Sequence, residues 1–264
     1  MFKFIKKIIS LSLFTLLIAC GSHDKNTLKV GTISGPETDL MQVAKQVAKD
    51  KYGLNVKIIE FTDYTQPNAS LNDGSIDANM FQHQPYLDQQ IKDHHYPLIA
   101  IGKTFVYPMG IYSNKIKTLQ QIPTGGIISI PNDPSNEGRA LLLLQKAGLI
   151  TLKKSAGLFA TPVDIENNSK KLKFEELDAA QLARSLPDVS AAVINTNYAV
   201  PAGLSPTKDA IYTEGTDSPY VNIIVIRTDE ANDPRMKQLV SALQSDEVKA
   251  AAKKIFNDQA IAAW

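Results

Sequence analysis

Aromatic residues and a histidine gather in one short stretch, residues 79–86, which contains Phe81, His83 and Tyr86. Tyr64 lies a short distance upstream. Rings placed beside a histidine can line a small apolar pocket that encloses the side chain of a ligand. When this stretch is taken alone, packing in the protein core is the simpler explanation of Phe81 and Tyr86.

A second stretch, residues 132–139, contains groups suited to an anion. Asp133 and Pro134 are typical of an N-cap and a first helical residue, so a helix should start here, directly after a predicted strand. Free amide N–H groups and the helix dipole favour an anion at such a start. Arg139 could pair bidentately with a carboxylate. The alternative is a surface Arg139 that pairs with Glu137 or with solvent.

Two asparagines supply the third candidate group. Asn195 directly follows the apolar run 191–194, which reads as a strand buried on both faces, and Asn222 lies near the start of the apolar run 220–226. In parallel α/β sheets, ligands bind beyond the carboxyl ends of the strands. An asparagine oxygen there can accept from an ammonium group, although a turn or cap role is the alternative for Asn195. Together the three groups complement a free apolar amino acid.

Motifs for other chemistry are missing from the sequence. It contains no G-x-x-x-x-G-K-[ST], G-x-G-x-x-G or H-E-x-x-H, and the serine in 31–35 is one place late for a nucleophile elbow. His83, His94 and His95 lack the spacing that puts several metal ligands on one helical face. We therefore expect no enzyme activity, cofactor or metal site. A metal site built from distant residues and a loop serine hydrolase are the alternatives.

Strands and helices alternate along the body of the chain. A strand at 28–33, a helix closed by Gly53 and a strand at 56–61 form a strand–helix–strand unit, typical of a parallel α/β sheet. Further strands are predicted at 98–101, 105–112, 127–130, 172–177, 191–194 and 220–226, and further helices at 86–94, after Asp133, after Asp233 and at 245–256. The absence of an obvious flexible linker favours two interwoven lobes. The strand at 105–112 is a candidate for crossing between them.

The first twenty residues form a separate unit. Lys3, Lys6 and Lys7 precede an apolar run, 8–19, which is shorter than the roughly 20 residues that a spanning helix needs. This pattern matches a signal peptide. The run ends at Cys20 in a sequence that resembles a bacterial lipobox, so we expect cleavage before Cys20 and lipidation of its thiol. The alternative is an uncleaved signal anchor with an idle cysteine.

The cysteine content and the net charge indicate which compartment and which partners to expect. Cys20 is the only cysteine, so the mature body has no internal disulfide although it should face an oxidising compartment. The formal net charge of +1 and the 44% hydrophobic content are ordinary for a globular protein. Such a balance gives no basic field to attract nucleic acid.

Several separated stretches resemble the methionine-binding lipoproteins of bacterial ABC importers. The resemblance covers nearly the whole chain, and its most specific stretches are 61–64 with 67–68, 76–83 with 85–87, 104–108, 131–134, 192–196, 218–222 and Trp264. It implies a two-lobed α/β periplasmic-binding-protein fold, type 2-like, in which each lobe is a mixed sheet flanked by helices. The expected divisions are a signal peptide at 1–19, a lipidated tether at 20–27, a first lobe at 28–108 and 200–264, and a second lobe at 109–199.

The resemblance also implies roles for individual residues. Arg139 should grip the ligand carboxylate, while Asn195 and Asn222 hold the amino end. Four residues should surround the ligand side chain: Tyr64, Phe81, His83 and Tyr86.

The implied function is the capture of methionine, L and/or D, and its delivery to a membrane permease with its ATPase. The protein would be anchored to the cell membrane by lipid and face the periplasm or extracytoplasmic side. Within the same class, another small apolar amino acid or a methionine-containing dipeptide is the alternative ligand. A periplasmic enzyme with His83 as base and a surface adhesin are the alternatives from other classes.

Overall fold

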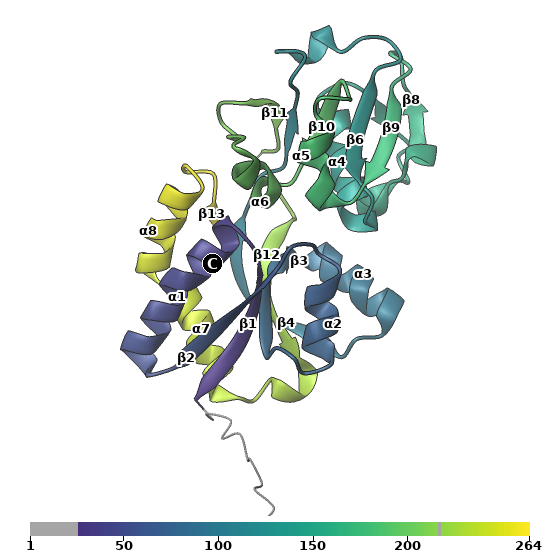
Figure 1. Ribbon diagram of the computed structural model, residues 1–264. Coiled ribbons are helices and arrows are strands. Elements are labelled where there is room, and N and C mark those ends of the chain that lie inside the picture. Colours follow the sequence, from purple (N-terminus) through teal and green to yellow (C-terminus); the bar gives the residue numbers. More distant parts are fainter. Residues whose placement is uncertain (1–25, 216–217) are drawn as a thin grey trace, which may run out of the picture.

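The chain folds into two lobes, each built on its own β-sheet (Figure 1). The computed structural model describes residues 26–215 and 218–264. The predicted signal peptide, the lipidation site Cys20 and residues 20–25 of the predicted tether lie outside the described residues. No described helix combines the length and the apolar character that crossing a membrane requires.

The first lobe contains a six-stranded sheet in the order β13-β4-β12-β3-β1-β2. Its strands are β1 (Thr27–Ile33), β2 (Asn55–Phe61), β3 (Ala78–His83), β4 (Leu98–Val106), β12 (Val221–Arg227) and β13 (Ile261–Ala262). β1 lies parallel to β2 and β3, whereas β12 runs antiparallel to β3 and β4. The sheet is therefore mixed, and the carboxyl ends of β1 and β3 face the second lobe, where the chain can hold a ligand.

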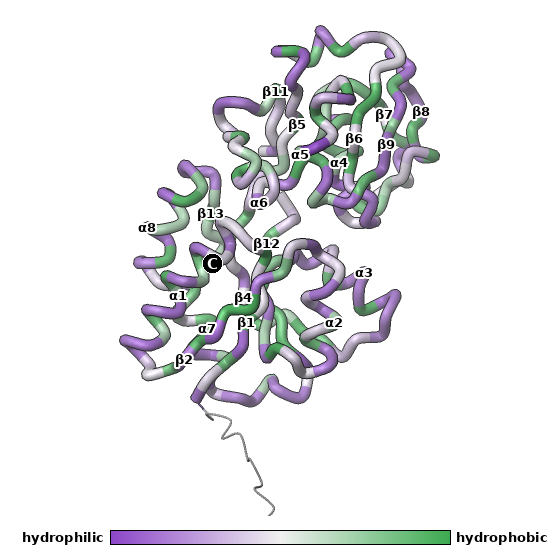
Figure 2. The backbone as a smooth tube through the Cα atoms, in the orientation of Figure 1, coloured by the Kyte–Doolittle hydropathy of each residue, from purple (hydrophilic) through white to green (hydrophobic). Residues whose placement is uncertain are grey.

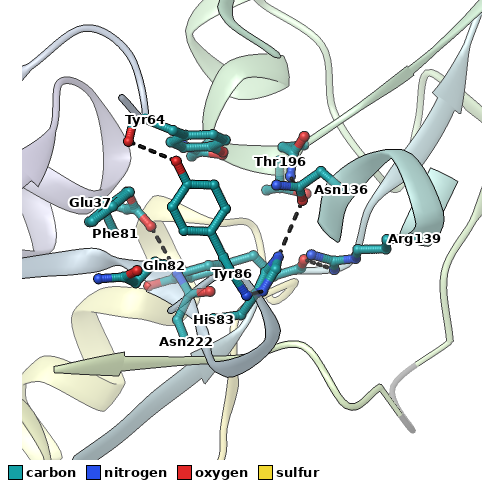
Figure 3. Close-up of a pocket in the computed structure, with 13 residues that line it drawn as sticks. Glu37, Tyr64, Phe81, Gln82, His83, Tyr86, Asn136, Arg139, Thr196 and Asn222 are labelled. Atoms are coloured by element: carbon teal, nitrogen blue, oxygen red, sulfur yellow. Dashed lines mark hydrogen bonds between the residues drawn. The ribbon is translucent and has the colours of Figure 1, made fainter. Parts of the chain in front are cut away.

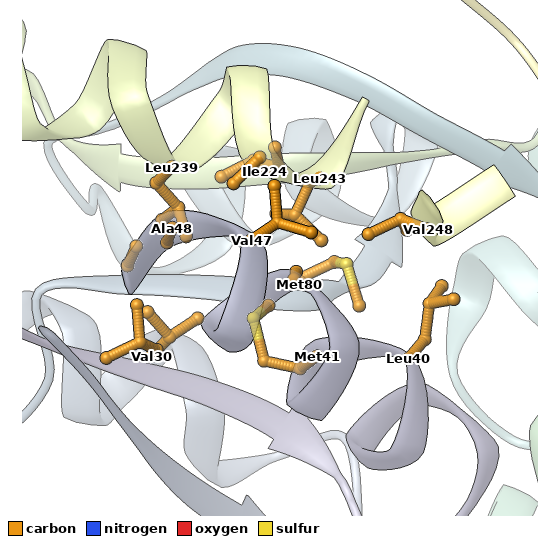
Figure 4. Packing of buried hydrophobic residues seen from close by; sticks show 14 of the residues in the cluster. Val30, Leu40, Met41, Val47, Ala48, Met80, Ile224, Leu239, Leu243 and Val248 are labelled. Carbon is orange, nitrogen blue, oxygen red and sulfur yellow. The ribbon is translucent and has the colours of Figure 1, made fainter. Parts of the chain in front are cut away.

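Helices cover both faces of this sheet. α1 (Pro36–Tyr52), α7 (Pro234–Leu243) and α8 (Asp246–Ile255) pack on one face, and α2 (Gln66–Asn72) and α3 (Gln84–His94) lie on the other. Successive residues of a strand point to opposite faces, so Ile224 joins the first core and Val225 the second. Figure 4 shows Ile224 among Met80, Leu239 and Leu243 in the first of these cores.

The second lobe contains a five-stranded sheet in the order β11-β5-β10-β6-β9. Its strands are β5 (Gly110–Tyr112), β6 (Ile127–Pro131), β9 (Lys173–Leu177), β10 (Ala191–Ile194) and β11 (Ala210–Thr213). Its helices are α4 (Pro134–Lys146), α5 (Leu182–Ser185) and α6 (Thr196–Ala199), and a small ladder joins β7 (Thr151–Leu152) to β8 (Ile165–Asn167). Every residue of β10 is buried, as the apolar run predicted. In Figure 2 the hydrophobic residues concentrate along strands inside each lobe.

The chain crosses between the sheets twice, and the second crossing corrects a predicted boundary. The first crossing joins β4 to β5, and the second joins β11 to β12. Residues 200–264 were assigned to the first lobe, but β11 pairs antiparallel with β5 in the second sheet. That pairing covers the edge of β5 that β10 leaves open, and edge strands are normally protected in this way. The chain returns to the first sheet only with β12.

Candidate ligand-binding site

A cavity of about 370 Å³ lies where the two lobes meet (Figure 3). Residues of both lobes form its wall: Glu37, Tyr64, Phe81, Gln82, His83, Tyr86, Tyr107, Asn136, Arg139, Asn195, Thr196, Asn197 and Asn222. All seven predicted ligand-binding residues are among them.

One wall of the cavity is aromatic. Tyr64 lies 5.9 Å from Phe81 and 5.9 Å from Tyr86 between ring centroids, and Phe81 lies 5.8 Å from Tyr86. The edge-to-face contacts of Tyr86 are a favoured geometry for such rings. The Tyr86 hydroxyl donates to the Tyr64 carbonyl oxygen at 2.9 Å, and the Tyr64 hydroxyl donates to Asn197 at 2.7 Å. These hydrogen bonds fix the rings, so the wall is preformed.

His83 ends β3 and caps α3 at the boundary between the lobes. Its Nδ1 accepts from the Tyr86 backbone N–H at 3.2 Å, which leaves Nε2 as the donor to Asn136 Oδ1 at 3.2 Å. Burial, and then the nearby charge of Arg139, lower the pKa of His83 to about 3. The imidazole is therefore neutral near pH 7, and a group with so low a pKa is a weak general base at that pH.

Asparagine side chains surround the polar end of the cavity. Asn195, the residue after β10, donates to Asn136 Oδ1 at 2.9 Å, while its own buried Oδ1 has no partner among the described residues. Asn222 donates to Glu37 Oε1 at 3.1 Å, and Glu37 Oε2 likewise lacks a partner there. Leaving a buried oxygen unpaired costs about 1–3 kcal/mol, so these two oxygens are suited to accept from a ligand.

Glu37 is 1% exposed and stands in the first turn of α1. Burial raises the pKa of its carboxyl well above the usual range, and the Asn222 amide only partly offsets this. Burial therefore favours the neutral form of Glu37, and an ammonium group placed beside it would favour the charged form.

Arg139 projects from the first turns of α4, whose start is fixed by Asp133. The Asp133 side chain accepts from the Asn136 backbone N–H at 3.0 Å, as the predicted N-cap requires. Arg139 is 4% exposed, and it forms an ion pair with Glu214 and donates to the Tyr107 carbonyl oxygen at 2.9 Å. The surface alternative, with Glu137 or solvent as its partner, is wrong.

Several wall residues were missed by the sequence analysis. Asn136, three residues after the predicted N-cap, and Glu37, just beyond the end of β1, occupy positions that the rule for strand ends could have indicated. Glu214, which pairs with Arg139 but is not part of this wall, carries no such signal, because it follows a short strand that the sequence did not reveal. Across residues 26–215 and 218–264, no group of three or more His, Cys, Asp or Glu side chains is arranged to hold a metal ion.

Known proteins share both the sequence and the fold. D-methionine-binding lipoprotein MetQ of Salmonella typhimurium is 54% identical over 94% of this chain and 93% of its own length. A solved ABC transporter periplasmic substrate-binding protein from Coxiella burnetii is 64% identical, with a TM-score of 0.87 over 89% of this chain and 100% of that one. A nutrient binding protein from Burkholderia cenocepacia, solved bound to methionine, is 55% identical, with a TM-score of 0.88 over 90% and 100% of the two chains.

These structural matches confirm the predicted two-lobed α/β periplasmic-binding-protein fold. The model of the NlpA lipoprotein family matches residues 28–264, which include both lobes and every residue of the cavity wall. With the resemblance thus confirmed over nearly its whole length, the chain belongs to the NlpA lipoprotein family.

Proposed function

We propose that this protein is the substrate-binding lipoprotein of an ABC importer, which captures methionine between its lobes and delivers it to the membrane permease with its ATPase. One observation carries the proposal: a single interlobe cavity combines an arginine, an aromatic wall and two buried oxygens that have no partner in the part of the chain that the structure describes. That set complements the carboxylate, ammonium group and apolar side chain of a free amino acid. Relatives named for methionine binding support the choice of ligand.

Each group has a distinct role in this proposal. Arg139 binds the ligand carboxylate, and Asn195 and Asn222 hold its amino end. The side-chain pocket consists of Tyr64, Phe81, His83 and Tyr86. Nothing in these contacts requires a chemical step, a cofactor or a metal.

Enclosure between lobes is what permits tight binding of so small a ligand. Methionine has about nine non-hydrogen atoms, and at a ceiling near 1.5 kcal/mol per atom its binding could reach roughly −13 kcal/mol. Submicromolar affinity, below about −8 kcal/mol, needs more than half of that ceiling. Closure of two lobes around the ligand supplies the required contact on all sides.

Ligand carried through purification tests this function directly. Mass spectrometry of the supernatant from freshly purified, then denatured, protein should detect methionine in near-stoichiometric amount. Another apolar amino acid or a methionine-containing dipeptide would favour the alternative ligands. A ligand-free protein that also fails to bind methionine in calorimetry would contradict the proposal.

Methionine should stabilise and compact the protein. Ligand that binds only the folded state adds about 2.7 kcal/mol to the free energy of unfolding at 100 times Kd. Thermal unfolding should therefore shift upward with methionine concentration, and solution scattering of initially ligand-free protein should show a smaller radius of gyration on addition. Tight binding with unchanged scattering would place the site elsewhere than between mobile lobes.

Cys20→Ala should release the protein from the membrane. We propose that the mature protein is anchored through acyl chains on Cys20, facing the periplasm or extracytoplasmic side, and each buried CH₂ contributes about 0.8 kcal/mol to that anchoring. Fractionation should find the variant outside the membrane fraction, while calorimetry finds its methionine affinity unchanged. A variant that stays membrane-bound with its leader intact would show an uncleaved signal anchor.

A further inference from the structure

Glu214 contacts the guanidinium of Arg139 along one edge. Arg139 Nε donates to Glu214 Oε1 at 3.2 Å, and Arg139 Nη2 donates to Glu214 Oε2. The side chains of Arg139 and Glu214 are 4% and 10% exposed, so this is a buried ion pair with two parallel hydrogen bonds. Nη2 also donates to the Tyr107 carbonyl oxygen, which leaves Nη1 without a protein partner among the described residues.

The carboxylate of Glu214 is itself fixed at both crossings between the lobes. The Met109 backbone N–H, on the first crossing, donates to Glu214 Oε2 at 3.1 Å, and the Glu214 backbone N–H returns a bond to the Met109 carbonyl oxygen at 2.8 Å. Ser218, on the second crossing, donates its hydroxyl to Glu214 Oε1 at 3.2 Å. The donors Met109 and Ser218 hold the carboxylate of Glu214 in one position, so it can fix the orientation of Arg139.

The two sides of Arg139 face different cavities. Arg139 lines the interlobe cavity, and Glu214 does not. Arg139, Glu214 and Tyr220 together line a separate cavity beside α4, and the Tyr220 ring lies 4.5 Å from the guanidinium carbon. Glu214 therefore lies outside the wall of the interlobe cavity, on the side of Arg139 that faces the separate cavity.

This arrangement balances the positive charge of Arg139 in the interlobe site. Arg139 is the one cation in the wall of the interlobe cavity, within the part of the chain that the structure describes, and Glu214 offsets it. Two other titratable groups of the wall favour neutral forms, since burial lowers the pKa of His83 and raises that of Glu37. A zwitterion adds no net charge of its own to this desolvated volume, whereas an anion adds an uncompensated negative charge.

We propose that Glu214 is a positioning residue that orients Arg139 from behind and balances its charge, and that it thereby makes the site selective for a zwitterion over an anion. The inference rests on the proposed role of Arg139 as the partner of the ligand carboxylate. With Nε and Nη2 engaged, Arg139 offers Nη1 to the ligand in one fixed orientation. Glu214→Gln retains the size of the side chain and removes the negative charge, so the site should become more tolerant of an anion.

The test compares two ligands that differ only in the amino group. Calorimetry would measure the dissociation constants of methionine and of 4-(methylthio)butanoate, which lacks the ammonium group and carries a net negative charge. Wild type should prefer methionine strongly. In Glu214→Gln that preference should fall by about tenfold or more. Methionine loses the fixed orientation of Arg139, whereas the anion gains a positive charge on Arg139 that Glu214 no longer offsets. Glu214→Asp retains the charge and should keep the preference, even if both ligands bind more weakly.

Glu166→Gln is the matched control, because it removes the same charge from an exposed residue of β8. Its preference should stay within about twofold of wild type, well under the tenfold that corresponds to 1.4 kcal/mol. A Glu214→Gln protein that unfolds at the wild-type temperature and keeps the wild-type preference would overturn the proposal, as would an equal loss for both ligands. Failure of wild type to bind methionine at all would instead overturn the proposed function.

Discussion

Arg139→Ala should weaken methionine binding by roughly 30- to 4000-fold, because loss of one partner of an enclosed charge pair typically costs 2–5 kcal/mol. Arg139 is 4% exposed in the cavity wall, so water cannot readily replace it beside the ligand carboxylate. The substitution also leaves Glu214, 10% exposed, without its cation. We therefore expect the free energy of unfolding to fall as well, since removing one partner of a buried ion pair costs about 3–5 kcal/mol.

Methionine amide separates the loss of affinity from the loss of stability. Wild type should strongly prefer the acid to the amide, and Arg139→Ala should lose most of that preference in calorimetry. Arg139→Lys keeps the positive charge but lacks the planar fork that pairs with Glu214 and the Tyr107 carbonyl oxygen at once, so it should fold and bind with intermediate affinity. If a folded Arg139→Ala protein discriminates acid from amide as well as wild type does, Arg139 is not the carboxylate partner.

Local features of the fold could be predicted because the residues that determine them are adjacent in sequence. Asp133 caps α4, Asp233 caps α7, and Gly53 ends α1 in the left-handed conformation at φ 64°. The strand predictions were less accurate. Residues 98–101 and 105–106 were predicted to lie in two strands, but both belong to one strand, β4. Gly102 continues this strand where it packs against α7, and a Cβ on Gly102 would lie 2.9 Å from the Val240 side chain.

Features that depend on distant residues could not be predicted in the same way. β11 and β13 are short, and each is a strand only because it pairs with a sheet edge formed elsewhere in the chain. Glu214 lies 75 residues from Arg139 in sequence, and no local pattern joins them. By contrast, the seven wall residues that were predicted came from the resemblance together with the rule that ligands bind beyond strand ends.

Gly138→Ala tests how tightly α4 is held against its neighbour, and two opposing effects decide the outcome. Alanine is favoured over glycine inside a helix by about 1 kcal/mol, which would stabilise α4. However, a Cβ at residue 138 would lie 2.1 Å from the Leu158 carbonyl oxygen and 2.9 Å from the Ala160 nitrogen. These are backbone atoms that cannot rotate away, so either α4 or the segment at 157–160 must shift. Overpacking of this kind costs about 1–3 kcal/mol and occasionally more, so we expect net destabilisation.

The same shift should reach the ligand, because α4 carries both Asn136 and Arg139 into the cavity wall. Denaturant unfolding should show a lower midpoint for Gly138→Ala, and calorimetry should show methionine binding weakened along with it. Gly215→Ala is the control, since a Cβ there meets nothing within 4 Å among residues 26–215 and 218–264, and the stability of this variant should change little. A Gly138→Ala protein as stable as wild type would show that the segment at 157–160 yields freely, and that helix propensity outweighs the close approach. Stability lost with full affinity retained would instead show that the segment moves while α4 and its two ligand-facing side chains stay in place.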